Sequence, residues 1–308
     1  MRDQTQHTPR RLAKERPARS PLRLILILLG LLAVCGAVCL ALAWRLGVFE
    51  PEPVTFLYGD RVMTALEGVA VNAYDPAGFS VDGQGRVTYQ REGLQARMGI
   101  DVSYYQGEID WQAVAGDGVE FAMLRLGYRG YTEGGLFLDK RFEENLRGAL
   151  EAGIEVGVYF FSQALTPQEA EEEAEFVLGQ LEGLPPGSIT YPVAFDWEFI
   201  TPGQPARTHQ MDGQTLTQCA LAFCQAIDQG GYTPAVYFNQ DLGYLHYDLS
   251  QLQQLPLWLA EYDTSPDFFY RFHLWQYTHT GTVAGIQGAV DLNLDLRPAL
   301  EEDVPDNG

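Results

Sequence analysis

The chain has 308 residues and is 46% hydrophobic, with 32 Gly and 17 Pro, which is typical of a globular α/β protein with many turns. Its formal net charge is −21, and residues 1–23 carry seven basic and two acidic residues, so the rest of the chain has a net charge of −26. A body this acidic argues against nucleic acid as a partner, because nucleic-acid binding requires a basic face.

The cysteines and histidines do not indicate a metal site or a nucleophilic centre. The four cysteines form no C-x-x-C pair, and the five histidines are scattered along the chain. Neither a zinc site nor a Ser/His/Asp triad is therefore predicted, and no cofactor is expected.

An uncharged run of 21 residues, Leu24 to Trp44, follows the basic N-terminus. As a helix with a rise of about 1.5 Å per residue, this run would span a hydrocarbon core of about 30 Å. Cleavable signal peptides have a shorter apolar core and a small-x-small exit, so we expect an uncleaved anchor. Basic residues precede the run, which predicts a cytoplasmic tail over 1–23 and a single-pass protein of the cell membrane with its remainder outside.

Residues 45–97 are expected to form an extracytoplasmic linker or stalk rich in β-structure. The clearest signal is a hairpin over Phe79–Tyr89, with its turn at Asp82-Gly83 and Gly85. Two interpretations remain open, a separate stalk module or a strand pair packed on the main domain. The sequence assigns this segment no chemistry.

Strand and helix signals alternate over residues 98–300. The expected strands are 98–103, 121–127, 155–163, 191–198, 235–239, 257–262, 272–278 and 289–294. Helical patterns follow the early strands, over about 139–152, 167–181 and 214–229, and thin out afterwards. This order predicts an α/β fold, an irregular (β/α) TIM-like barrel with reduced later helices. Residues 301–308 are expected to be an acidic tail.

The fourth expected strand is apolar and ends on two acids, Asp196 and Glu198. Alternate strand residues share a face, so both carboxylates point one way and Trp197 points the other. Mutual repulsion and partial burial would raise one pKa and leave a proton donor beside an ionised partner. Taken alone, the pair could equally be an ordinary acidic strand end.

Two further acids lie in the first and last expected strands, Asp101 and Asp291. If the barrel closes, these strands are neighbours and the two acids lie close together, facing Asp196 and Glu198 across the barrel mouth. Such an acidic bowl is typical of sugar hydrolysis. Each of the two also has a plainer explanation, as a turn cap or as a partner of an Arg or a backbone amide.

Aromatic residues fall at or near the same strand ends. Aromatic rings pack on the apolar faces of sugars and their polar tips bind hydroxyls, although any one of them could be a core residue. The candidate substrate-binding residues are Tyr104, Tyr159, Phe160, Tyr262 and Trp275.

Several of these segments together resemble the glycoside hydrolase family 25 lysozymes, the N,O-acetylmuramidases. The resemblance covers residues 98–297 and leaves out 1–97. The matching pieces, in order, include Gly99–Ser103 with Gln106, Arg125–Arg129, Gly157–Ala164, Phe195-Asp196 with Glu198, Trp275–Tyr277 and Val290–Asn293.

The resemblance implies an irregular β/α barrel that hydrolyses the β-1,4 bond between N-acetylmuramic acid and N-acetylglucosamine in peptidoglycan. It places the family's catalytic acid on Glu198, its second carboxylate on Asp196 and its supporting acids on Asp101 and Asp291. Many members carry His where this chain has Phe160. Many also have a Lys-Ala-Thr-Glu-Gly-like strand in place of Arg125–Arg129, and both departures concern sugar contacts.

Two rival functions are consistent with parts of the sequence. A chitinase-like or glucosaminidase barrel also uses D-x-E on its fourth strand, but it normally carries further acids upstream, where this chain has Pro192-Val193-Ala194. The other rival is a non-catalytic peptidoglycan-binding or scaffold domain. The presence of all four acids argues against it.

Overall fold

The computed structural model describes residues 21–45, 52–91 and 94–297. The chain divides into two compact units, residues 1–64 and 65–308. The expected acidic tail, and the expected cytoplasmic tail up to residue 20, lie outside the described residues.

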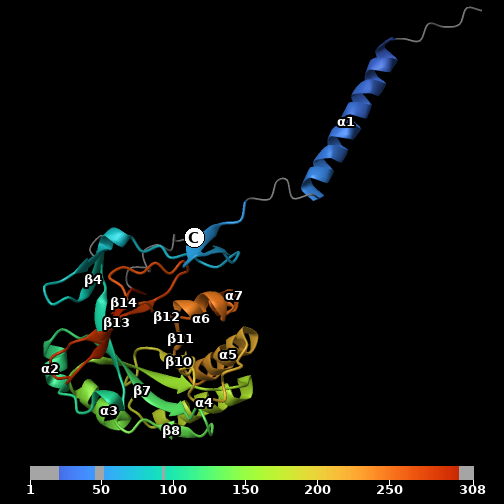
Figure 1. Cartoon of the computed structure of the whole chain (residues 1–308). Helices are drawn as coiled ribbons and strands as arrows, with labels where there is room; N and C mark the ends of the chain where they lie inside the picture. The colour runs from blue at the N-terminus through green and yellow to red at the C-terminus, as the bar shows by residue number, and fades with distance from the viewer. Residues whose placement is uncertain (1–20, 46–51, 92–93, 298–308) are drawn as a thin grey trace, which may run out of the picture. The chain divides into compact units, whose positions relative to one another are not determined.

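The first unit contains one long helix and one hairpin (Figure 1). Helix α1, Pro21–Arg45, has 25 residues, a hydropathy of 3.0 over its most apolar window, and no buried residue. At about 1.5 Å per residue it is about 38 Å long, enough to cross a hydrocarbon core of about 30 Å. Strands β1 (Thr55–Tyr58) and β2 (Arg61–Thr64) pair antiparallel.

The second unit is built on a closed ring of eight strands, and each strand expected over 98–294 is present. In ring order they are β6 (Arg97–Val102), β7 (Phe121–Arg129), β9 (Glu155–Ser162), β10 (Val193–Trp197), β11 (Pro234–Asn239), β12 (Leu257–Ala260), β13 (Leu274–Gly281) and β14 (Val290–Asp295). Strand β8, Leu136–Leu138, adds to the edge of β7. The predicted barrel is therefore confirmed.

The last strand runs against the others. Strand β14 is antiparallel to both β13 and β6, whereas the pairs from β6 through β13 are parallel. Its first residues therefore lie at the end of the barrel where β6 finishes, and Asp291 is the register partner of Asp101. Asp291 stands near the start of its strand, and it joins the other acids because that strand is reversed.

Helices cover the outside of the early strands and become shorter later, as expected. They are α2 (Trp111–Gly116), α3 (Phe142–Glu151), α4 (Pro167–Leu181), α5 (Gly213–Gln229), α6 (Gln240–Leu245) and α7 (Leu249–Leu252). Helix α4 begins as its sequence predicts, with Thr166 accepting a hydrogen bond from the Glu169 amide and Pro167 at the first position. Helices α4 and α5 pack side by side (Figure 1).

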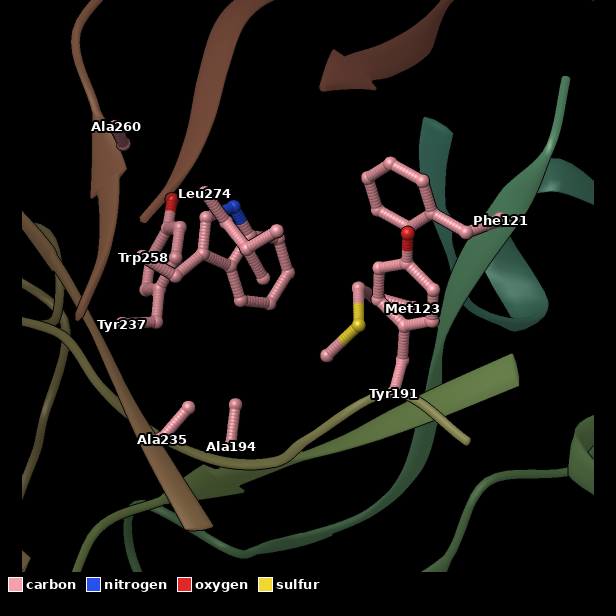
Figure 2. Packing of buried hydrophobic residues seen from close by; sticks show 9 residues of the cluster. All are labelled: Phe121, Met123, Tyr191, Ala194, Ala235, Tyr237, Trp258, Ala260 and Leu274. Carbon is pink, nitrogen blue, oxygen red and sulfur yellow. The ribbon is translucent and has the colours of Figure 1, made fainter. Parts of the chain in front are cut away.

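The barrel interior below the site is filled by aromatic rings set against small residues (Figure 2). The rings of Phe121 and Tyr191 stack, with centroids 4.4 Å apart. Gly99 makes room for this pair, because a Cβ there would lie 2.2 Å from the Phe121 ring. Trp258 packs on Tyr237 with ring centroids 4.8 Å apart. This plug makes the barrel a closed bowl rather than a pore.

Residues 65–97 belong to the barrel unit, which selects the second of the two interpretations left open for the hairpin. Strands β3 (Phe79–Val81), β4 (Val87–Arg91) and β5 (Leu94–Gln95) form a small antiparallel sheet preceded by a short 3-10 helix, Pro76–Gly78. The sheet packs on the barrel, because the ring of Phe79 meets that of Trp275 at 5.3 Å and the Tyr74 hydroxyl donates to the Phe272 carbonyl at 2.6 Å.

Arg86 fastens this sheet to the barrel. Its guanidinium forms a salt bridge with Asp117 and donates to the carbonyls of Asp117 at 2.9 Å and Thr282 at 3.1 Å, and the residue is 7% exposed. Removal of Arg86 would leave the carbonyls of Asp117 and Thr282 without this donor, whereas the partly exposed Asp117 carboxylate would keep its hydrogen bond from the Ala284 amide.

We predict that Arg86→Met lowers the free energy of unfolding by about 2 kcal/mol, the usual cost of losing hydrogen bonds of a charged group at a partly buried site. Chemical unfolding of the full-length protein in detergent measures this loss. The matched control is Arg91→Met on the same sheet, whose ion pair with Asp75 is 4.0 Å long and half exposed. It should cost less than about 1 kcal/mol. Equal losses in both variants would contradict the proposed anchoring.

Candidate active site

A cavity of about 430 Å³ opens at the end of the barrel where the parallel strands finish. All four predicted acids line it, namely Asp101 on β6, Asp196 and Glu198 at the end of β10, and Asp291 on β14. The other lining residues are Val102, Ser103, Tyr105, Gln106, Arg125, Tyr131, Tyr159, Phe161, Ile200, Tyr237, Trp258, Tyr262 and Gln276. The predicted acidic bowl therefore exists.

The two acids of the fourth strand share a face, and the tryptophan between them does not. Asp196 and Glu198 line the cavity, while Trp197 is fully buried and its ring lies 5.0 Å from that of Phe199. The strict alternation of strand residues produces this division. Trp197 is thus a packing residue, as predicted.

Asp101 is held by two side-chain amides. Its Oδ2 accepts hydrogen bonds from Nε2 of Gln276 and Nδ2 of Asn293, both at 2.8 Å. Two tyrosine hydroxyls fix Gln276, since Tyr237 and Tyr262 donate to its Oε1 at 3.0 and 3.1 Å. The Nε1 of Trp258 fixes Asn293 by donating to its Oδ1 at 2.8 Å.

Asp196 has fewer hydrogen bonds than Asp101. Its Oδ1 is buried and has no hydrogen-bond partner among the described residues. Burial raises the pKa of this carboxyl well above its ordinary value, and the charge of the Arg125 guanidinium, on β7, opposes that rise. An under-bonded buried carboxylate oxygen at the wall of a cavity is available to a ligand.

Burial raises the pKa of all four carboxyls, and repulsion from a neighbouring acid adds to the rise for Asp101, Asp196 and Glu198. Burial raises the pKa of Asp101, and the charge of Asp291 adds to this. Burial and then Glu198 raise the pKa of Asp196, while burial and then Asp291 raise the pKa of Glu198. Burial also raises the pKa of Asp291, against the opposing charge of His279. The cluster therefore retains protons at pH values where exposed carboxyls have lost theirs.

Arg125 carries positive charge at the cavity wall. Its Nε donates to Asp139 Oδ2 at 2.8 Å, and its guanidinium lies over the rings of Tyr104 and Tyr105 at 5.1 and 5.3 Å. Tyr105 lines the cavity and is 72% exposed, whereas Tyr104 packs beneath it with ring centroids 4.2 Å apart. The rim on this side is an aromatic and cationic surface.

The predicted aromatic contacts divide into three groups. Tyr159 and Tyr262 line the cavity, and Tyr104 supports its rim through Tyr105. The predictions for Phe160 and Trp275 are corrected. Phe160 is fully buried against Phe176, with ring centroids 5.9 Å apart, because alternation turns it away from the face that Tyr159 occupies.

Trp275 is also fully buried and packs against Phe79 in the small sheet of β3, β4 and β5. Its Nε1 donates to the carbonyl of Glu261 at 2.8 Å. The next residue, Gln276, faces the cavity instead. Trp275 is therefore part of the interface with the hairpin rather than of the sugar site.

No role in the site is predicted from the sequence for four residues that lie in it, Gln276, Asn293, Tyr237 and Trp258. A signal existed for Asn293, which stands two residues after Asp291 and so shares its face. Gln276 is a polar residue within the buried run Leu274–Tyr277, where its neighbours are large and hydrophobic or aromatic, which is unusual. Tyr237 and Trp258 lie within their strands and look like core residues in the sequence.

Within the described residues, no group of three or more His, Cys, Asp or Glu side chains is arranged to hold a metal ion. The chemistry supported by the site is proton transfer by carboxyl groups and stabilisation of positive charge, with aromatic surfaces for a ligand.

Known proteins share both the sequence and the fold of this region. The autolytic lysozyme of Clostridium acetobutylicum is 30% identical over 196 residues, which cover 63% of this chain and 54% of that protein. Lysozyme M1 of Streptomyces globisporus is 31% identical over 206 residues, covering 64% of this chain and 66% of that protein. The chain thus spans between about half and two thirds of the length of these relatives.

Among solved structures, a bacterial lysozyme from Streptomyces coelicolor superposes with a TM-score of 0.53 at 26% identity, covering 64% of this chain and 90% of that one. The autolysin LytC of Streptococcus pneumoniae, solved with a synthetic peptidoglycan ligand, shares the fold with a TM-score of 0.55 at 23% identity, over 78% of this chain and 60% of that one. Residues 100–286 match the sequence profile described as "Glycosyl hydrolases family 25". The chain therefore belongs to glycosyl hydrolase family 25.

Proposed function

We propose that this protein is a peptidoglycan hydrolase, a muramidase that cleaves the β-1,4 bond between N-acetylmuramic acid and N-acetylglucosamine. The single observation that carries the proposal is the meeting of four carboxyls from three separate strands in one cavity walled by aromatic residues. Two of the relatives described above are named lysozymes, and membership of the family supports the same substrate class.

Glu198 is the general acid of this proposal. The carboxyl is largely buried, and both its burial and the nearby Asp291 raise its pKa, so it keeps a proton that it can give to the leaving glycosidic oxygen. Its position at the end of β10 and on the cavity wall supports this role.

Asp196 is the ionised partner in this scheme and acts from the same face. Burial, Glu198 and Asp101 raise its pKa, and the charge of Arg125 opposes that rise. We assign the proton to Glu198 because the leaving oxygen needs a donor, and the negative charge of the two neighbouring acids then lies on Asp196. Two roles are open to it. It either orients the 2-acetamido group of the substrate as an internal nucleophile or stabilises positive charge at the anomeric carbon. Its free Oδ1 suits both roles, because each requires an oxygen that the protein has not already bonded.

Asp101 and Asp291 are positioning acids in this scheme. They face each other across the β6–β14 pair, and the charge of Asp291 raises the pKa of both Asp101 and Glu198. Their task is to set the protonation of the acids that touch the sugar.

The proposal extends to location. We propose that Leu24 to Trp44, within α1, anchors the chain as a single span, with residues 1–23 in the cytoplasm and the barrel over 98–300 outside, where peptidoglycan lies. The length and hydropathy of α1 support a span, and the basic residues before it support this orientation.

Replacement of the general acid tests the proposed chemistry. We predict that Glu198→Gln lowers the rate of glycan cleavage by about 100- to 10,000-fold, the usual contribution of general acid catalysis. The measurement is release of new reducing ends from purified sacculi by the full-length protein in detergent, with mass analysis of the fragments. The wild type should produce muramic acid reducing ends.

The control for that experiment is Glu144→Gln, an exposed carboxylate on α3 paired with Arg141 at 2.6 Å. It should cleave like the wild type. Near-normal turnover by Glu198→Gln would refute its role, glucosamine reducing ends would favour a glucosaminidase, and absence of cleavage by the wild type would favour a binding domain.

The raised pKa of Glu198 also predicts a stability effect with a definite sign. Burial and then Asp291 raise it above the ordinary 4.5, so the folded state holds the proton more tightly than the unfolded state does. Stability from this group is therefore greatest at low pH and is lost as pH rises through the interval between the two values.

We therefore expect Glu198→Gln to gain stability relative to wild type on going from about pH 3.5 to about pH 7, since Gln never ionises. Urea unfolding midpoints of both proteins at the two pH values measure the gain. A difference that stays constant with pH would show that the carboxyl has an ordinary pKa in the folded protein.

The location is tested at the helix. We predict that full-length protein sediments with membranes and resists carbonate extraction. The double variant Leu32→Arg/Ala33→Arg should be released, because each charge costs about 2.5–3.5 kcal/mol at the centre of a span. Val62→Arg on the exposed β2 is the control and should remain bound. A mature wild-type protein that starts beyond Trp44 would instead identify α1 as a cleaved signal.

A further inference from the structure

A second cavity lies beside the acidic one, and the β3–β4 hairpin forms one of its walls. It has a volume of about 340 Å³, which falls in the range of about 300–1,000 Å³ found for small-molecule sites. Three segments form it, the β3–β4 turn from Gln84 to Val87, the loop of Tyr262–Thr264 after β12, and the β13–β14 hairpin. The family profile begins at residue 100, so the first of these walls comes from outside it.

Tyr262 joins the two cavities, because it lines both. Its ring is 53% exposed and lies 4.5 Å from that of His279, while its hydroxyl donates to Gln276 at 3.1 Å. Gln276 in turn holds Asp101. A chain-like ligand that passes from one cavity to the other therefore crosses the exposed face of an aromatic ring fixed to the acid network.

The lining of the second cavity suits a neutral, hydroxyl-bearing ligand. It carries the amide of Gln84 and the side chains of four threonines, at positions 264, 278, 280 and 282. The hydroxyls of Thr278 and Thr280 lie 3.1 Å apart and can each donate or accept. Groups of this kind exchange hydrogen bonds with sugar hydroxyls and acetamido groups.

The charges at this cavity argue for sugar rather than for the carboxylates of a stem peptide. Arg86 is the cation that lines it, and its guanidinium is already bonded to Asp117 and to the Thr282 carbonyl. Asp263 adds a negative charge at the same wall. A peptide carboxylate would meet repulsion there, whereas a neutral saccharide would not.

The hairpin is held rigidly enough to form a binding wall. Val87 is 3% exposed and Tyr89 is 2% exposed, and Arg86 ties the turn to two segments of the barrel. A wall that is already ordered in the free protein contributes to binding without a loss of conformational entropy.

We propose that this cavity is an accessory glycan subsite, which binds sugars of the strand that continue beyond the acidic cavity past Tyr262. The proposal rests on the proposed function, and it makes the hairpin a determinant of preference for long glycan chains.

The test compares soluble N-acetylglucosamine–N-acetylmuramic acid oligomers of four and eight sugars as substrates of the full-length protein in detergent. The wild type should cleave the octamer with the higher kcat/KM. The double variant Gln84→Ala/Thr264→Val should reduce that preference by about three- to tenfold, the effect of one or two lost hydrogen bonds, through the KM of the octamer.

The control is Ser80→Ala/Thr88→Val on the same hairpin, whose hydroxyls bond each other at 2.9 Å and lie outside the cavity. It should keep the full preference for the octamer. Equal kcat/KM for the two oligomers in the wild type, or an unchanged preference in the Gln84/Thr264 variant, would overturn the subsite and leave the muramidase intact. Cleavage of neither oligomer would overturn both proposals.

Discussion

The direction of β14 is the constraint on which the site depends. A parallel last strand would place Asp291, near its start, at the opposite end of the barrel from the other acids. Reversal sets it opposite Asp101 in the β6–β14 register. The same reversal brings Asn293, two residues further along the same face, within 2.8 Å of Asp101. One strand thus supplies both a like charge that raises the pKa of its neighbour and an amide that stabilises it.

The acid cluster is costly to the fold, and its neighbours offset that cost unequally. Asp101 receives two amide hydrogen bonds, each positioned by aromatic residues that also fill the barrel. Asp196 keeps an oxygen that has no hydrogen-bond partner in the part of the chain that the structure describes. Unsatisfied buried groups of this kind destabilise a protein and persist where function requires them. This contrast agrees with the proposed division between Asp101 as a positioning acid and Asp196 as an acid that faces substrate, whereas burial does not distinguish the two acids, since they are similarly buried.

The sequence predicts the eight strands and the four acids because both depend on local patterns, namely short apolar runs and acids at their ends. It does not predict strand direction, because an antiparallel and a parallel strand have the same alternation. The errors at Phe160 and Trp275 have a different cause. Nearness to a strand end does not imply exposure to the site, because the period of two turns Phe160 away from the face of Tyr159. Long-range partners such as Gln276 and Asp101 become visible only when the barrel closes.

The segment before the barrel, residues 65–91, is part of the barrel unit. Residues 66–72 run along the segment before β13, with the Leu66 amide bonded to the Tyr270 hydroxyl at 2.9 Å and the Arg271 amide bonded to the Ala70 carbonyl at 2.9 Å. The chain is therefore fixed to the barrel before it reaches the hairpin. The β3–β4 hairpin then forms one wall of the second cavity. The segment before the barrel therefore contributes to the surface next to the acidic cavity. A flexible replacement for this segment would therefore remove one wall of the second cavity, which in our proposal contacts the glycan.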